Sequence, residues 1–172
     1  MTRPARTHVL ERRQVVPLPI ERTFDFFDDP RNLARITPGW LAFRVLHEGP
    51  VAMREGLEID YRIRPLIVPQ RWTSRITRYH PPVAFVDEQV RGPYAFWRHQ
   101  HSFRALGDDA TEVSDRVEYG LPLGVLGEVA HALFVRKRLE AIFRYRERAV
   151  EAILGAASSE EPPWPPRADN PW

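Results

Sequence analysis

The chain has 172 residues, of which 43% are apolar and 11% aromatic, a length that fits one globular domain with a sizeable core. It contains no cysteine, which excludes disulfides, thiol catalysis and cysteine-ligated metal sites. The 25 basic and 23 acidic residues are interspersed and leave a formal net charge of only +2, so no nucleic-acid partner is expected.

The sequence shows no targeting or membrane-spanning pattern. No apolar segment follows residues 1–7, so we expect no signal peptide. The longest apolar stretch, 121–135, is interrupted by Glu128 and His131 and is too short and too polar to span a bilayer. We therefore expect a soluble cytoplasmic protein.

The first predicted elements are one strand and two short helices. The strand covers 7–16, and apolar residues at helical spacing predict an amphipathic helix over 19–27. A second short helix begins at Pro30, with Asp29 suited to be its N-cap, and ends before Pro38.

Alternating apolar and polar residues then predict a run of strands. They cover 41–47, 55–64, 70–79, the two arms of a hairpin within 82–103, and 111–119. The hairpin turns at Arg91-Gly92-Pro93, where glycine and proline interrupt the extended pattern. Short turns between consecutive strands predict an antiparallel meander.

A long helix is predicted over about 124–154. Its buried stripe is expected to comprise Leu126, Ala130, Leu133, Phe134, Ile142, Phe143, Val150 and Ile153. Its polar surface carries Arg136, Lys137, Arg138, Arg144, Arg146 and Arg148. This basic surface is either a solvated face or, with Leu121, Leu123, Val125 and Leu126 as an apolar tip, a site of transient contact with an anionic membrane surface.

The two ends of the chain are expected to lie outside the domain, which spans 7–155. Residues 1–6 are predicted to be a flexible arm. The segment 156–172 is rich in proline and lacks periodicity, so we expect disorder, with a docking peptide around Trp164 and Trp172 as the alternative.

The hairpin within 82–103 carries the strongest functional signal. Alternation places Phe85, Asp87 and Gln89 on one face of the first arm. It places Trp97, His99, His101 and Phe103 on one face of the second arm. Large aromatics around a short polar row are typical of a ligand cavity, in which apolar walls hold a molecule and polar groups orient it.

Two histidines in His-x-His spacing point into the same space and allow three interpretations. His99 and His101 can form a satisfied hydrogen-bond network with Asp87 and Asp115, which is the interpretation we favour. They can orient a ligand, or they can hold zinc with one of these carboxylates. His-x-His supplies only two ligands, and zinc sites usually need three or four, so we predict no tightly held metal.

A buried carboxylate is costly unless it is paired, and the two histidines are the obvious partners of both aspartates. Such a pair can act as a general base that removes a proton next to a carbonyl. The alternative, which we favour, is a structural role in which the buried pair only stabilises the sheet. The four candidate catalytic residues are therefore His99, His101, Asp87 and Asp115.

The full set of candidate ligand-binding residues adds aromatic walls to this polar row, although ordinary core packing is the alternative for the aromatics. The set is Tyr61, Trp72, Ser74, Asp87, Gln89, Trp97, His99, His101, Asp115, Tyr119 and Phe134. The sequence has no Gly-rich phosphate loop and no nucleotide motif, so no cofactor is expected.

Several stretches resemble one bacterial ligand-binding branch of the START-like, or SRPBCC, superfamily. They are residues 24–33 (FDFFDDPRNL), 36–38 (ITP), 85–89 (FVDEQ), 92–94 (GPY), the Trp97/His99/His101/Phe103 alternation and 115–119 (DRVEY). The resemblance covers about 7–154 and implies the α+β helix-grip fold. In that fold a curved antiparallel sheet, here of about seven strands, wraps a long C-terminal helix, and two short helices follow the first strand. It also implies a cavity between sheet and helix.

Members of that superfamily bind lipids, hormones or polyketides, some catalyse reactions on them, and they share no catalytic signature. We therefore expect a protein that binds a small, mainly hydrophobic molecule. The alternatives are a cyclase or dehydratase that uses the His–Asp pairs, and an interaction module. The sequence leaves the oligomeric state open.

Overall fold

The computed structural model describes residues 6–47, 49, 51–65 and 68–156. The predicted arm 1–6 and the predicted disordered tail 156–172 therefore fall almost wholly outside the described residues.

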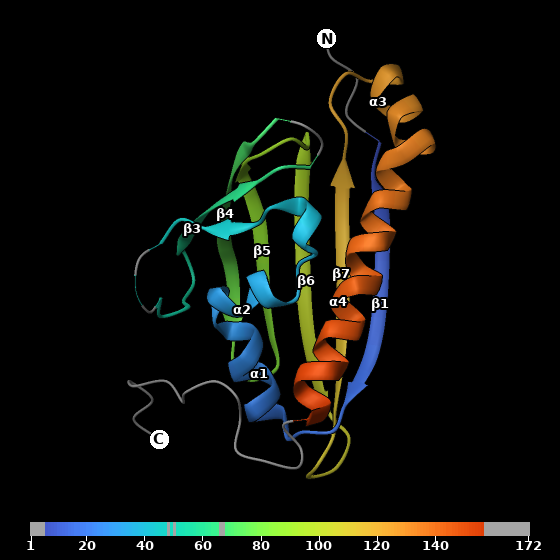
Figure 1. The fold of residues 1–172 in the computed structure, drawn as a ribbon. Helices are drawn as coiled ribbons and strands as arrows, with labels where there is room; N and C mark the ends of the chain where they lie inside the picture. The colour runs from blue at the N-terminus through green and yellow to red at the C-terminus, as the bar shows by residue number, and fades with distance from the viewer. Residues whose placement is uncertain (1–5, 48, 50, 66–67, 157–172) are drawn as a thin grey trace.

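Seven antiparallel strands form one curved sheet, as predicted (Figure 1). The strands are β1 (His8–Val16), β2 (Arg44–Val45), β3 (Glu58–Ile63), β4 (Gln70–His80), β5 (Ala84–Arg91), β6 (Phe96–Ala105) and β7 (Thr111–Gly120). Their order is β1-β7-β6-β5-β4-β3-β2, so β2 to β7 follow one another and the first strand pairs with the last. This order confirms the predicted meander.

One predicted strand is mostly wrong. The segment 41–47 forms strand only at β2, because its first residue belongs to the 3-10 turn η1 (Gly39–Leu41) and Ala42 then adopts a left-handed φ of 47°. That backbone turn prevents an extended run from beginning before Phe43.

Two short helices lie against the concave face of the sheet, as Figure 1 shows. They are α1 (Ile20–Asp28) and α2 (Pro30–Arg35). The Asp29 carboxylate accepts the backbone N–H of Arg31 at 2.9 Å, so the predicted N-cap is confirmed. Asn32 donates its side-chain amide to the carbonyl of Phe26 at 2.9 Å, which ties α2 to α1.

A long C-terminal helix packs across β7 and β1 (Figure 1). It consists of α3 (Val125–Ala130), a π-helical segment η2 (His131–Val135) and α4 (Arg136–Ala156). The residues of α4 that are buried against the sheet recur at helical spacing. They are Leu139, Phe143, Arg146, Val150 and Leu154.

The predicted stripe is confirmed in α4 and wrong in the first part of the helix. Leu126, Leu133 and Phe134 are 72%, 67% and 44% exposed. The cause is the orientation of the helix, because Glu128 and His131 face His8 of β1 and Tyr119 of β7, which leaves these apolar residues facing away from the sheet. The predicted solvent-facing arginines include a second error, since Arg146 is only 9% exposed.

We predict that Phe143→Ala lowers the free energy of unfolding by roughly 3–5 kcal/mol, because this ring is almost fully buried. Phe134→Ala is the matched control on the same helix and should change it little. Chemical denaturation of both variants measures the difference. Equal losses would mean that the α4 stripe does not hold the helix on the sheet.

Candidate functional site

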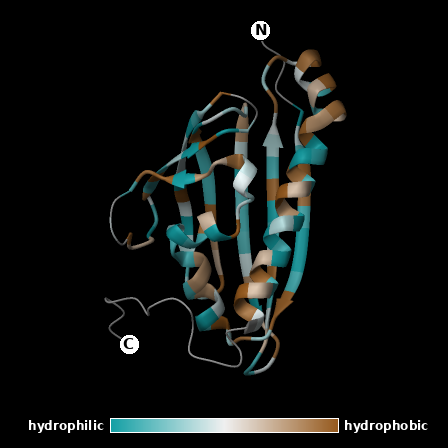
Figure 2. Ribbon diagram, viewed as in Figure 1, coloured by the Kyte–Doolittle hydropathy of each residue, from teal (hydrophilic) through white to brown (hydrophobic). Residues whose placement is uncertain are grey.

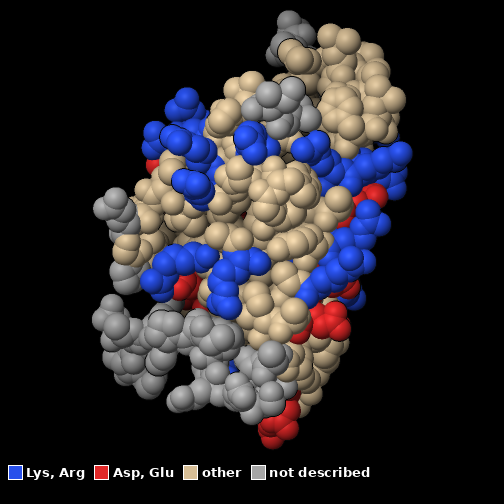
Figure 3. Space-filling view, in the orientation of Figure 1, with Lys and Arg blue, Asp and Glu red and all other residues tan. Residues whose placement is uncertain are grey.

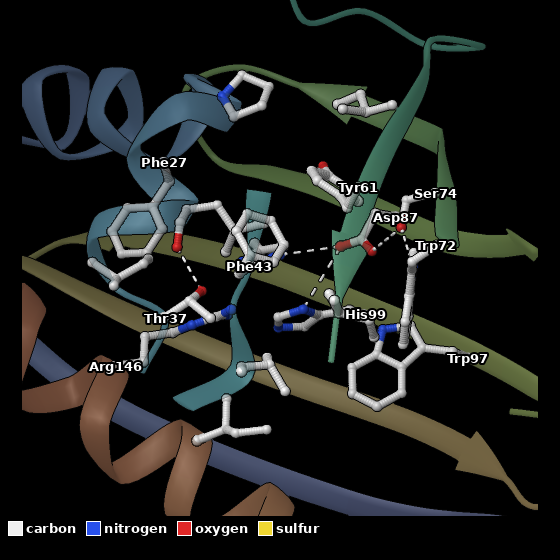
Figure 4. A pocket seen from close by; sticks show the side chains of 18 of the residues that line it. Phe27, Thr37, Phe43, Tyr61, Trp72, Ser74, Asp87, Trp97, His99 and Arg146 are labelled. Carbon is white, nitrogen blue, oxygen red and sulfur yellow. Dashed lines mark hydrogen bonds and ion pairs between the residues drawn. The ribbon is translucent and has the colours of Figure 1, made fainter. Parts of the chain in front are cut away.

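A cavity of about 180 Å³ lies between the concave face of the sheet, the short helices and α4. Its walls are mostly apolar. They include Ile76 and Phe85 from the sheet, Met53 from the segment between β2 and β3, and Leu139, Ile142 and Phe143 from α4. Figure 4 shows the polar side chains of the cavity gathered around Asp87 and His99. The cavity is thus an apolar space with one polar wall.

Most of the predicted ligand-binding residues line this cavity. They are Tyr61, Trp72, Ser74, Asp87, Trp97, His99 and His101. Asp115 and Tyr119 are buried on the same face of β7, but neither of them lines the cavity. Phe134 is half-exposed and lies away from the cavity, because the helix there turns His131 and Val135 toward the sheet.

Gln89 has a different position from the one predicted. It does not line the cavity but holds the β5–β6 loop, donating its side-chain amide to the carbonyl of Tyr94 at 2.9 Å and accepting the Tyr94 N–H at 3.3 Å. A Cβ on Gly92 would lie 2.2 Å from the Gln89 side-chain oxygen, so this clamp requires glycine there. The clamp places Tyr94 in the cavity wall, a role that the sequence analysis missed.

Aromatic rings meet edge to face at this end of the cavity. Trp72 and Trp97 have ring centroids 5.3 Å apart at 89°, and Tyr94 lies 5.6 Å from Trp72. The Trp72 indole donates to the Ser74 hydroxyl at 2.9 Å, and that hydroxyl donates to Asp87 at 3.3 Å. The aromatic wall is therefore connected directly to the polar wall.

The polar wall is built by the register of three strands. Asp87 on β5 faces His99 on β6, and His101 on β6 faces Asp115 on β7. His99 Nε2 lies 2.8 Å from Asp115, and His101 Nε2 lies 3.3 Å from Asp87. Each histidine therefore contacts one carboxylate directly across the ladder and the other diagonally.

The remaining ring nitrogens approach the same carboxylates less favourably. His99 Nδ1 lies 3.7 Å from Asp87, and His101 Nδ1 lies 3.2 Å from Asp115 without the alignment of a hydrogen bond. The two rings themselves are 3.8 Å apart. The four side chains form one compact cluster, as the network interpretation predicted.

Burial and the mutual charges push the two histidines in opposite directions. Burial, together with the charge of His101, lowers the pKa of His99 to about 4. Burial also opposes protonation of His101, but the two carboxylates beside it, Asp115 and Asp87, outweigh burial and raise the pKa of His101. Of the two rings, His101 is therefore the one that more readily takes up the extra proton.

Both carboxylates stay ionised. Burial opposes this, but the contacts with the two histidines hold the pKa of Asp87 below its usual value and that of Asp115 well below it. Burial and the Asp87 charge raise the pKa of Tyr61, which remains a neutral hydroxyl in the cavity wall.

Arg146 is the main site residue that the sequence analysis missed. Its guanidinium reaches from α4 toward His99 (Figure 4), with Nη1 3.9 Å from Asp115. Nε and Nη1 are buried and have no hydrogen-bond partner among the residues that the structure describes. Its spacing from Phe143 and Val150 already matches the buried face of the helix, and that signal could have identified it.

The cluster also contains a set of metal-ligand atoms. Asp87, His99 and His101 each offer one such atom, and these atoms lie within 4.8 Å of one another. Each is already in contact with an oppositely charged or hydrogen-bonding group, so the expectation of no tightly held metal stays a prediction, open to elemental analysis of untagged protein.

Comparisons with known proteins agree with this geometry. The family model described as polyketide cyclase / dehydrase and lipid transport matches residues 16–143. No curated protein matches the sequence.

Among the described helices, none is long and apolar enough to cross a membrane.

Three solved structures illustrate the fold. A norcoclaurine synthase point mutant from Thalictrum flavum, in complex with a transition-state analogue, has a TM-score of 0.61 at 13% identity over 88% of this chain and 98% of that chain. The Zhui aromatase/cyclase from Streptomyces sp. R1128 has a TM-score of 0.64 at 17% identity over 88% and 94%. Major latex-like protein 151 from Panax ginseng has a TM-score of 0.62 at 13% identity over 86% and 97%.

At these identities the structural likeness shows the fold alone, which is the helix-grip fold that the sequence resembles. The family match covers most of the chain and agrees with the observed sheet and helix. The chain therefore belongs to the polyketide cyclase/dehydrase and lipid transport family, within the SRPBCC proteins.

Proposed function

We propose that this protein binds a small, mainly hydrophobic molecule in the cavity between the sheet and α4. The observation that carries the proposal is the cavity itself, whose walls are apolar except for one cluster of polar groups. Apolar walls supply affinity through burial, and a few placed polar groups supply orientation.

The volume of the cavity limits the size of the ligand. At about 180 Å³, the cavity is close to the size of an engineered cavity of about 150 Å³ that accepts benzene. A one-ring or two-ring aromatic molecule or a short acyl group fits such a space, whereas a full lipid does not fit without enlarging it.

Arg146 defines what the ligand carries at its polar end. A buried guanidinium without hydrogen-bond acceptors for two of its nitrogens is costly. A carbonyl or hydroxyl oxygen of the ligand, placed beside His99, would accept from Arg146 and remove that cost. We therefore infer an oxygen-bearing ligand, with Arg146, His99 and Ser74 as the orienting groups.

A second candidate function, a cyclase or dehydratase, is favoured by one observation. Asp115 supports His99 at 2.8 Å, while the other ring nitrogen of His99 faces Asp87 on the cavity side, an arrangement suited to a general base. A base works best when its pKa lies near the working pH, and the His99 pKa of about 4 makes it a weak base at neutral pH. Binding is supported by the cavity itself, whereas catalysis would also need one of these histidines to act as a base, so binding is the proposal that we favour.

We predict that Arg146→Met weakens binding of an oxygenated aromatic probe, 2-naphthol, by roughly tenfold or more, because a charge-assisted hydrogen bond is lost. Binding of naphthalene should change little. Arg144→Met, at an exposed position of the same helix, is the control. Displacement of an apolar fluorophore gives both affinities. Equal effects on the two probes would contradict the role of Arg146, and binding of neither probe to the parent protein would contradict the cavity proposal.

His99→Gln separates a binder from an enzyme. Glutamine can still form hydrogen bonds but cannot transfer protons, so a binder should lose some stability and affinity together. An enzyme would keep its affinity and lose turnover by about 10²–10⁴-fold on a ligand that co-purifies with the protein. We expect the first result, measured as melting temperature, affinity and product formation on one preparation.

The two histidines should make opposite contributions to the pH dependence of the free energy of unfolding. The pKa of His101 is raised above 6.5, so its stabilising contribution is complete below pH 6.5 and is lost as the pH rises through the folded-state pKa. The pKa of His99 is lowered from 6.5 to about 4, so the protein loses stability as the pH falls from 6.5 toward 4.

We therefore predict that His101→Gln removes part of the loss of stability above pH 6.5, and that His99→Gln removes part of the loss between pH 6.5 and 4. Urea denaturation across this range measures both, with the exposed His80→Gln as control. Parallel pH profiles for all three variants would contradict the assigned protonation states.

A further inference from the structure

The first part of the C-terminal helix exposes its apolar side to water. We name the residues Leu123, Val125, Leu126, Val129, Leu133 and Phe134 the apolar tip; all six are exposed, Leu123 the most at 78%. Figure 2 shows this end of the helix as largely hydrophobic, and the face of it that is in view in Figure 3 carries no charged residue. A contiguous apolar patch of this kind marks a site of interaction.

Polar contacts on the other side of the helix fix this orientation. His131 Nε2 lies 2.9 Å from the Tyr119 hydroxyl, and His8 lies 3.2 Å from Glu128. The His8 and His131 rings stack with centroids 3.6 Å apart. The helix therefore turns its polar side toward β1 and β7 and its apolar side outward, the reverse of an ordinary surface helix.

The loop before α3 holds its leucine outward at a cost. Leu123 has a φ of 70°, in the left-handed region that is unfavourable for a residue with a side chain. This backbone conformation directs a highly exposed leucine away from the protein at the start of α3.

Basic residues surround the base of the apolar tip. We name Arg6, Arg136, Lys137 and Arg138 the basic collar. Arg6 lies 4.0 Å from Glu128 and Arg136 lies 3.1 Å from Glu140, which leaves the collar with more cations than nearby carboxylates. Arg138 packs on the exposed ring of Trp40 at 4.6 Å. Figure 3 shows positive charge following the helix directly below its apolar end.

We propose that the apolar tip inserts into the interfacial region of an anionic membrane, with the basic collar against the lipid headgroups. Apolar side chains beside Lys and Arg are the combination by which interfacial segments bind such surfaces. A second copy of the chain is a poorer occupant, because two tips in contact would bring two basic collars together.

This surface adjoins the cavity. Leu139 and Ile142, which line the cavity, follow Phe134 by about one and two helical turns. A docked tip therefore places the α4 wall of the cavity near the lipid surface. The inference does not depend on the identity of the ligand or on ligand binding itself.

The test is co-sedimentation of the full chain with vesicles of phosphatidylcholine and phosphatidylglycerol in equal amounts, and with vesicles of phosphatidylcholine alone. The parent protein should bind the anionic vesicles more tightly, and binding should weaken as salt rises. Leu126→Ser with Leu133→Ser should reduce binding roughly tenfold or more, because buried apolar area drives insertion. The control is Val15→Ser with Val83→Ser, at exposed apolar positions elsewhere.

The basic collar has its own test. Arg136→Gln with Lys137→Gln should weaken binding to the anionic vesicles by about fivefold for each charge removed. Arg75→Gln with Arg104→Gln, on the sheet, changes the net charge equally and should have a smaller effect. All variants should keep the parent melting temperature, since the substituted side chains are exposed.

Three results would overturn the proposal. They are no binding to anionic vesicles at moderate salt, equal binding by the tip variant and the parent, and a concentration-dependent dimer that the tip substitutions abolish while vesicle binding is absent. The last result would assign the tip to self-association.

Discussion

The carboxylate of Asp115 is the contact on which the interior of this protein depends. It lies on β7, contacts His99 and His101 from β6, and lies 3.9 Å from Arg146 of α4. A buried carboxylate is tolerated only when its charge is met, so the alignment of β6, β7 and α4 is coupled to a single oxygen atom. A change in register by one residue would separate these charges and turn the histidines to the other face.

The same cluster keeps a cavity polar on one wall while the rest is apolar. The Asp87 carboxylate lines the cavity and accepts a hydrogen bond from Ser74, which in turn accepts one from Trp72 of the aromatic wall. When His101 is protonated, its charge and that of Arg146 balance the two ionised carboxylates. A ligand oxygen near Arg146 then fits better as a neutral carbonyl or hydroxyl than as a second buried anion.

The long helix serves two environments along its length. In α4 its apolar residues and Arg146 face the sheet, while around α3 its apolar residues face away from the protein. The change occurs at the π-helical segment 131–135, where His131 anchors the helix to Tyr119. One element thus closes the cavity and presents the apolar tip, which is the physical link between the two proposals.

The sequence by itself determined the succession of strands in a meander and most of the inward row of hairpin residues, because alternation along a strand is a local property, and the family resemblance supplied the fold class. The pairing of the first strand with the last came only from the structure. The sequence also identified the cap at Asp29 and the pairing of His99 and His101 with two aspartates. Only the tertiary structure decided the rest. Which side of a helix faces the sheet depends on the groups opposite it, and Glu128 and His131 take the side toward β1 and β7, so Leu126, Leu133 and Phe134 were misassigned. Whether an arginine is buried depends on what lies opposite, and Asp115 lies opposite Arg146. Both outcomes depend on contacts between segments that are far apart in the chain, and no local sequence pattern encodes such contacts.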